Sequence, residues 1–74
     1  MNAEFEKRVG YNIRSIREKR HLTQEQLSAK LQVNGCDITR SALAKIEVGQ
    51  RHLYVDELKL IIEILNTTFE EIVK

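Results

Sequence analysis

Residues 38–49, which read ITRSALAKIEVG, decide the fold, because they predict a short helix whose outer side is unusually thin. At about 100° per residue, Leu43 and Ile46 fall on one side, as in a helix packed on a core. A surface helix normally carries long Glu, Lys and Gln side chains on its other side. Small side chains next to two cations therefore predict a closely approaching, negatively charged partner. The outer side carries Arg40 at its edge and then Ser41, Ala44, Lys45 and Val48.

Two helices are predicted ahead of this stretch. In the first, apolar residues recur every three or four positions and mark the buried side of a helix that runs to about Arg20. Thr23 and Gln26 then match a T-x-x-Q capping box, so a second helix is expected to begin at Thr23. It should end near Val33, because Asn34-Gly35 is the strongest turn signal in the chain. The apolar positions are Phe5, Val9, Ile13 and Ile16 in the first helix and Leu27 and Leu31 in the second.

The third helix is expected to lie between Thr39 as its N-cap and Gly49 as its stop. A fourth helix is predicted to open near Tyr54, because Asp56 and Glu57 follow in its first turn, where the helix dipole favours acids. Its predicted core positions are Leu58, Ile61, Ile62 and Leu65.

The chain after the fourth helix predicts one more short helix. Asn66 can end the fourth helix in a left-handed conformation, and Thr68 with Glu71 then matches a T-x-x-E capping box. No alternating run is long enough to indicate a strand. The predicted fold class is therefore all-α, with five short helices in a single domain spanning residues 1–74.

The charge distribution favours a polyanionic partner for the N-terminal part. Residues 1–22 hold six Lys and Arg against three Glu, whereas residues 53–74 hold two against five acids, although the net charge of the chain is only +1. The single cysteine, Cys36, has no partner for an internal disulfide. Because the sequence also shows no signal peptide and no long apolar run, we expect a cytoplasmic protein that does not enter a membrane.

The sequence does not indicate an enzyme. His21 and His52 fall in predicted loops, without a recognisable arrangement with Cys36 or a carboxylate. There is no glycine-rich phosphate loop, no H-x-x-x-H and no C-x-x-C. We therefore expect no catalysis, no metal, no cofactor and no small-molecule ligand.

Three quoted stretches, IRSIREKRHLTQEQLSAKL, ITRSALAKIEVGQR and ELKLIIEILNTTFEEI, together resemble the helix-turn-helix domain of the Cro/C1-repressor (Xre) family. The resemblance extends from about Val9 to Ile72. It implies a lambda-repressor-like fold with a helix-turn-helix unit at about 23–48, whose third helix lies in the DNA major groove. The matching positions include Arg17, the LTQEQL opening of the second helix, Leu43, Ile46, Glu47 and Gly49.

The sequence departs from the family pattern at two places. Gln32 stands where the family usually has Gly, and additional residues around Asn34 and Gly35 precede Ile38, so the turn between the second and third helices is predicted to be longer. Tyr54 stands where the family often has a small capping hydroxyl, and its phenol is expected near the DNA backbone.

The resemblance implies a role for each part of the surface. The third helix should contact bases, although phosphate contacts are nearly as well supported for its two cations. Arg17 and Glu47 should form a partly buried ion pair that orients the third helix without touching DNA. Apolar residues of the C-terminal helices at 54–74 form a candidate dimer interface. The expected base contacts are Arg40, Ser41, Ala44 and Lys45, the phosphate contacts Gln24, Thr39, Arg51 and Tyr54, and the dimer contacts Leu60, Ile64, Phe69 and Val73.

We therefore expect a transcriptional regulator, in particular a repressor, that binds a palindromic double-stranded DNA operator as a homodimer. The alternative is a protein-interaction module, such as an antitoxin or antirepressor, whose basic side is incidental. Salt-dependent binding to duplex DNA separates the two, because only phosphate neutralisation releases counterions.

Overall fold

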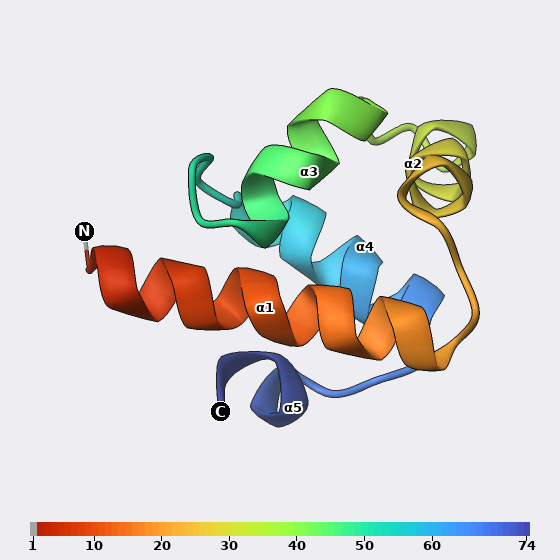
Figure 1. The fold of residues 1–74 in the computed structure, drawn as a ribbon. Coiled ribbons are helices and arrows are strands. Elements are labelled where there is room, and N and C mark those ends of the chain that lie inside the picture. The colour runs from red at the N-terminus through yellow and green to blue at the C-terminus, as the bar shows by residue number, and fades with distance from the viewer. Residues whose placement is uncertain (1) are drawn as a thin grey trace.

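The structure, a computed structural model, describes residues 2–74 as five helices and contains no strand within them. In Figure 1, α1 crosses the molecule between α5, which lies below it, and α3 and α4, which lie above it. Helix α1 packs against α3 and α5, while α2 packs against α3 and α4. The five helices confirm the predicted all-α class. Their bounds are Ala3–Lys19 for α1, Gln24–Val33 for α2, Arg40–Glu47 for α3, Val55–Leu65 for α4 and Phe69–Val73 for α5.

Side-chain caps fix the starts of α2 and α3 where the sequence predicts them. The Thr23 hydroxyl accepts from the backbone N–H of Gln26 at 3.0 Å, and the Gln26 side-chain oxygen accepts from the backbone N–H of Thr23 at 2.9 Å. The predicted capping box is therefore complete. Thr39 caps α3 by accepting from the backbone N–H of Ala42 at 3.1 Å.

The start of α5 differs from the prediction. Thr68 accepts from the backbone N–H of Glu71 at 3.2 Å, as a capping residue should. The Glu71 carboxylate, however, pairs with Lys74 at 2.8 Å instead of reaching back to the backbone of Thr68. The expected T-x-x-E box is therefore only half formed.

The turn between α2 and α3 is longer than a tight turn, as predicted, and it begins with a regular helix end. The N–H of Cys36 donates to the carbonyl of Leu31 at 2.9 Å, and the N–H of Gly35 donates to that of Gln32 at 3.0 Å. This is the Schellman pattern, which requires a left-handed residue just past the helix. Gly35 supplies it with φ of 83°.

Ile38 then anchors the chain before α3. Its side chain is fully buried. Its carbonyl accepts from the Ser28 hydroxyl at 2.8 Å and from the Gln32 amide at 3.2 Å, so two side chains of α2 hold the far end of the turn. The extra residues therefore form a fixed bridge between the two helices.

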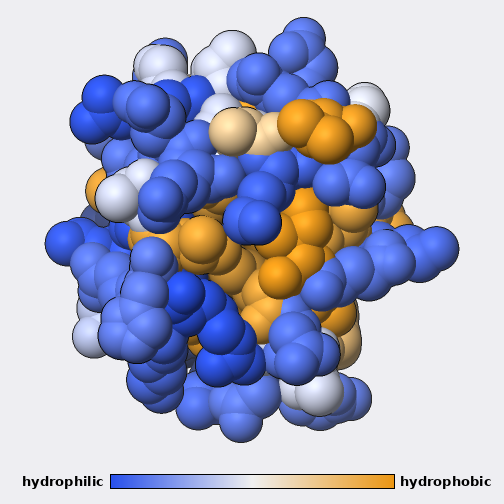
Figure 2. All heavy atoms as spheres, turned by 90° about the vertical axis from the view of Figure 1, so that its right-hand side faces the viewer, coloured by the Kyte–Doolittle hydropathy of each residue, from blue (hydrophilic) through white to orange (hydrophobic). Residues whose placement is uncertain are grey.

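One apolar core joins all five helices. From α4 it contains Ile61 and Leu65, whereas Leu58 and Ile62, which were also predicted as core, are half-buried at its edge. On the side where α2 and the end of α4 lie, apolar atoms remain visible between hydrophilic side chains (Figure 2). The buried apolar residues are Ile13, Leu27, Leu31, Ile38, Leu43, Ile46, Ile61, Leu65 and Ile72. Within residues 2–74, no helix has the length and apolar character needed to cross a membrane.

Candidate nucleic-acid interface

Helix α3 presents its two cations to solvent and its only acid to the core. Leu43 and Ile46 are buried, and so is Glu47, which is 4% exposed. Arg40 and Lys45 are exposed on the opposite side. The outer side of α3 therefore carries positive charge with no carboxylate of its own helix to offset it. The short side chains on this side are Ser41, which is exposed, Ala44, which is half-buried, and Val48, which is half-exposed just past the helix.

Arg17 of α1 holds Glu47 in a bidentate ion pair. Its Nε donates to Glu47 Oε2 at 2.7 Å and its Nη2 donates to Oε1 at 3.0 Å, while Nη1 donates to the carbonyl of Leu22 at 2.7 Å. The hydrogen bonds to Glu47 raise the pKa of Arg17 above its ordinary value, against the lowering effect of burial. The pair fastens α3 to α1 and neutralises the one acid of α3.

The side chain of Gln24, which is expected to contact a phosphate, makes a hydrogen bond within the chain. Its amide Nε2 donates to Glu47 Oε1 at 2.9 Å, so the side chain turns toward the ion pair and is half-buried. Of the first backbone N–H groups of α2, that of Gln26 donates to the Thr23 hydroxyl, whereas those of Gln24 and Glu25 have no partner within the helix. They open onto a polar hollow that α1, α2 and α3 share, lined by Arg17, Thr23, Gln24, Glu25 and Arg40.

Arg51 and Tyr54 stabilise the start of α4. The guanidinium of Arg51 donates to both carboxylate oxygens of Glu57, at 3.0 and 3.1 Å, and Glu57 also accepts from the backbone N–H of Tyr54 at 3.0 Å. The hydrogen bonds from Arg51 lower the pKa of Glu57, and those to Glu57 raise the pKa of Arg51. The Arg51 guanidinium also lies 5.9 Å from the Tyr54 ring, which is 65% exposed. With a further bond from Nη1 to the carbonyl of His52 at 2.9 Å, Arg51 makes three hydrogen bonds within the chain.

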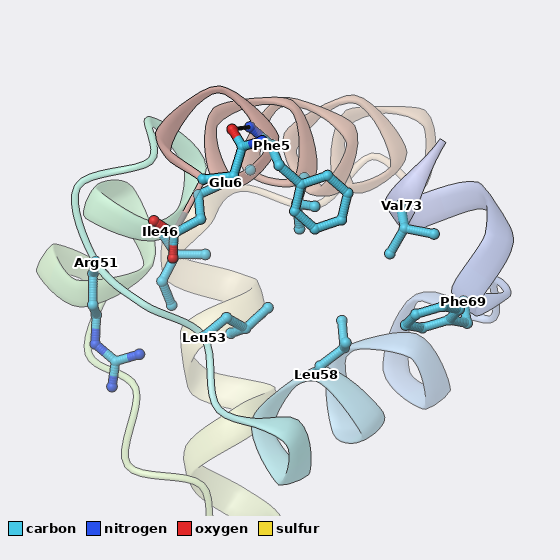
Figure 3. A pocket seen from close by; sticks show the side chains of 11 residues that line it. Phe5, Glu6, Ile46, Arg51, Leu53, Leu58, Phe69 and Val73 are labelled. Carbon is cyan, nitrogen blue, oxygen red and sulfur yellow. Dashed lines mark hydrogen bonds between the residues drawn. The ribbon is translucent and has the colours of Figure 1, made fainter.

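Three of the four residues expected in the dimer interface line two separate hollows, and the fourth, Ile64, is half-buried and lines neither. Leu60 lines a hollow with the α2–α3 turn, next to Cys36. Phe69 and Val73 line another hollow together with Leu58, as Figure 3 shows, and neither Leu60 nor Ile64 belongs to it. Helix α4 thus separates the expected contacts onto two flanks.

Gly10 is a structurally important residue that the sequence reading did not identify. A Cβ atom at this position would overlap the carbonyl oxygen of Ile46 and would lie 2.8 Å from that of Glu47. Only glycine therefore lets α1 approach the end of α3 this closely. The sequence offered one signal for this role, a glycine inside an otherwise helical pattern. Glycine weakens a helix, so its presence there often has a packing reason.

Cys36 and the acids near it do not form a recognisable chemical centre. Within residues 2–74, no three His, Cys, Asp or Glu side chains are grouped so that they could hold a metal ion. Burial raises the pKa of the half-buried Cys36 thiol, with further contributions from Glu57 and Asp56, which makes the reactive thiolate less accessible.

Comparisons with known proteins agree with this geometry. The family of helix-turn-helix domains matches residues 13–72, which is most of the chain. Among solved structures, the crystal structure of the DNA-binding domain of BldD is similar, with a TM-score of 0.84 and 22% sequence identity over 100% of both chains. No curated protein sequence gives a significant match. At this identity, the likeness to BldD shows a shared fold.

Proposed function

The chain belongs to the Cro/C1-type helix-turn-helix family, and on this premise we propose that it is a cytoplasmic, sequence-specific regulator that binds double-stranded DNA. Helix α3 enters the major groove, which is wide enough to admit a helix. The regulator acts as a repressor, because occupation of an operator is enough to exclude other proteins from it. Two copies bind the two halves of a palindromic site.

One observation carries the proposal. The outer side of α3 exposes Arg40 and Lys45, while Glu47, the only acid of α3, is buried against Arg17. A purely structural surface helix would more commonly carry acids and bases together on its outer side. Outward positive charge on a helix with short side chains suits close approach to DNA, whose phosphates are negatively charged.

Base readout falls to the exposed side of α3. The Lys45 ammonium can donate to guanine O6 or N7, and the hydroxyl of Ser41 can serve several bases. Ala44 and Val48 present methyl groups that suit the methyl group of thymine. Arg40 also lines the polar hollow at the start of α2, so it is placed for either a guanine or a phosphate.

Phosphate contacts are assigned mainly to backbone and exposed hydroxyl groups. The N–H groups at the start of α2 bind one phosphate, aided by the helix dipole, with Gln24 contributing its backbone. Thr39 and Tyr54 are exposed and contribute hydroxyl groups. Because Glu57 already neutralises the charge of Arg51, Arg51 contributes to phosphate binding only through guanidinium N–H groups that are not bonded within the chain.

The test is selection of bound sequences from a random duplex pool, followed by titration of the selected duplex at several salt concentrations. We expect one enriched motif and a log-log slope of about −0.9 per neutralised phosphate. A Lys45→Glu variant should lose binding, whereas Lys30→Glu, an equal charge change on the exposed part of α2, should retain most of it. Recovery of no enriched motif, or binding that ignores salt, would refute the proposal and favour a protein-interaction module.

A further inference from the structure

The first part of α1 contacts the end of α3 at three points. Gly10 lies against the last carbonyls of α3. A Cβ atom on Gly49, just past α3, would lie 2.7 Å from Cγ of Lys7 and 3.0 Å from its Cα. The carboxylate of Glu6 lies 2.7 Å from Nδ1 of His52 in the α3–α4 loop. The first turns of α1 thus lie beside the end of α3 (Figure 1), and these contacts hold the backbone of Lys7 there.

The ammonium group of Lys7 has no ion-pair partner within the described residues. Lys7 is exposed, and none of the ion pairs among residues 2–74 includes it. The adjacent acid, Glu6, is directed to His52, and its side chain is only 20% exposed. Glu4, one turn earlier on α1, is exposed and forms no ion pair with Lys7. The charge of Lys7 is therefore available to a negatively charged partner from outside the chain.

The length of α3 matters for where such a partner would lie. Helix α3 has eight residues, so it is about 12 Å long, which is about the width of the major groove. When α3 crosses the groove, each of its ends therefore lies near one phosphate backbone. The start of α3 shares a polar hollow with the start of α2, where one phosphate is proposed to bind. Lys7 lies at the other end of α3 and so faces the opposite wall of the groove.

Lys7 suits this contact better than Arg51, the cation expected just past α3. Arg51 is already neutralised by Glu57, whose carboxylate lies 3.0 Å from its guanidinium. Lys7 has no such partner, and its flexible four-carbon stem lets the ammonium group reach a phosphate from a fixed backbone. Lys7 also precedes residues 13–72, which match the helix-turn-helix family, so the family match gives it no role.

We propose that Lys7 binds a backbone phosphate at the end of α3, on the wall of the major groove opposite the start of α2. The inference rests on the proposed function and adds the first part of α1 to the DNA-binding surface. Phosphate contacts set the register and orientation of a protein on DNA but carry no direct sequence information. Lys7 is therefore a positioning residue, which fixes where α3 lies across the groove.

Two substitutions separate the charge of Lys7 from its packing on Gly49. Lys7→Met keeps an unbranched side chain and removes the charge, whereas Lys7→Arg keeps the charge. The affinity of the full chain for a duplex with one half of the selected site is measured between about 0.05 M and 0.5 M salt. One neutralised phosphate changes log K by about 0.9 per tenfold change in salt, so the loss caused by Lys7→Met should be about eightfold greater at low salt. Lys7→Arg should keep the wild-type slope.

Neutral methylphosphonate groups, placed one at a time along the duplex, locate the contact. One such replacement should weaken binding of the wild type but not of Lys7→Met, because both changes remove the same ion pair. Lys7→Met should also weaken all single-base variants of the half-site by a similar factor. A loss confined to one base pair would instead make Lys7 a base contact and would overturn the inference.

The controls separate this contact from folding and from DNA binding as a whole. Lys30→Met makes the same change at an exposed lysine of α2 and should keep the wild-type affinity and slope. Circular dichroism should show unchanged helicity for all variants. A wild-type salt slope for Lys7→Met would overturn this inference and leave DNA binding by α3 intact. A wild type whose binding does not depend on salt would overturn the proposed function and the inference together.

Discussion

At the scale of single residues, the ion pair that positions α3 is buried, whereas Arg40, Ser41 and Lys45, which are proposed to contact DNA, are exposed. Glu47 receives hydrogen bonds from Arg17 of α1 and Gln24 of α2, so one carboxylate joins three helices. A buried ion pair adds little net stability compared with apolar residues, but it fixes geometry, because each partner needs the other. We infer that the hydrogen bonds among Arg17, Gln24 and Glu47 set the orientation of α3.

Loss of one partner of this ion pair should be costly. Arg17→Ala leaves Glu47 buried without its counterion and should lower the free energy of unfolding by about 3–5 kcal/mol. Arg14→Ala is the matched control, because its pair with Glu18 is more than half exposed on the same helix, and it should cost less than about 1 kcal/mol. Urea denaturation of the two variants measures both values. Equal costs would mean that Glu47 is accommodated without Arg17.

The sequence indicated the pair of Arg17 and Glu47 through family resemblance, but it did not indicate the position of Gln24. Locally, a glutamine at the first position of a helix points to solvent or to a ligand. Only the packing of α3 on α2, which joins residues far apart in sequence, brings Glu47 within reach of its amide. The direction of this side chain therefore depends on tertiary packing and cannot be predicted from the neighbouring residues alone.

At the scale of helices, local signals predicted where each helix starts and stops, while the contacts between helices needed the structure. Thr23, Thr39 and Gly35 act where their chemistry indicates, because capping and left-handed turns depend on a few neighbouring residues. The role of Gly10, in contrast, does not depend on its neighbours in the sequence. Its role is visible only when α1 and α3 are placed together.

Gly10→Ala should therefore destabilise the folded protein, although alanine has the higher helix propensity. In an isolated helix this substitution would stabilise by about 1 kcal/mol. Here the added methyl group meets the backbone at the end of α3, so we expect a net loss of about 1–3 kcal/mol. Tyr11→Ala, at the next position and 66% exposed, is the control and should change thermal stability little. A higher melting temperature for Gly10→Ala would show that α1 does not approach α3 this closely.

The junction between the α3–α4 loop and α4 should respond to acid. Arg51 lowers the folded-state pKa of Glu57, so the stabilisation from this pair is present above the unfolded pKa of about 4.3 and is lost as the pH falls through the lower folded value. Glu57→Gln should remove this part of the pH dependence, with an effect at neutral pH of no more than about 1 kcal/mol because Arg51 is partly exposed.

Thermal unfolding between about pH 6 and pH 3 measures this difference. The gap in stability between wild type and Glu57→Gln should close as the pH falls. Glu70→Gln, at an exposed position of α5, provides the control, and its thermal stability should change with pH as that of the wild type does. A gap that stays constant with pH would exclude the ionised pair as its source.

At the scale of the whole molecule, helical periodicity predicted the all-α class and most of the core. It correctly marked Ile61 and Leu65 as buried but not which flank of α4 the last helix would adjoin. A helical pattern specifies an apolar side, whereas the neighbour of each flank depends on how the five helices pack together. This is why the expected dimer contacts combined Leu60 with Phe69, which lie on different flanks.

The central claim is that the outer side of α3 reads bases, and binding across all single-base variants of the selected operator tests it most directly. Lys45→Ala should cost about 1–3 kcal/mol on the preferred operator and should remove discrimination at one base pair. Lys30→Ala, which removes an exposed lysine of α2, should leave the pattern of preferences intact. Equal weakening of every variant by Lys45→Ala, or unchanged binding, would contradict base readout by α3.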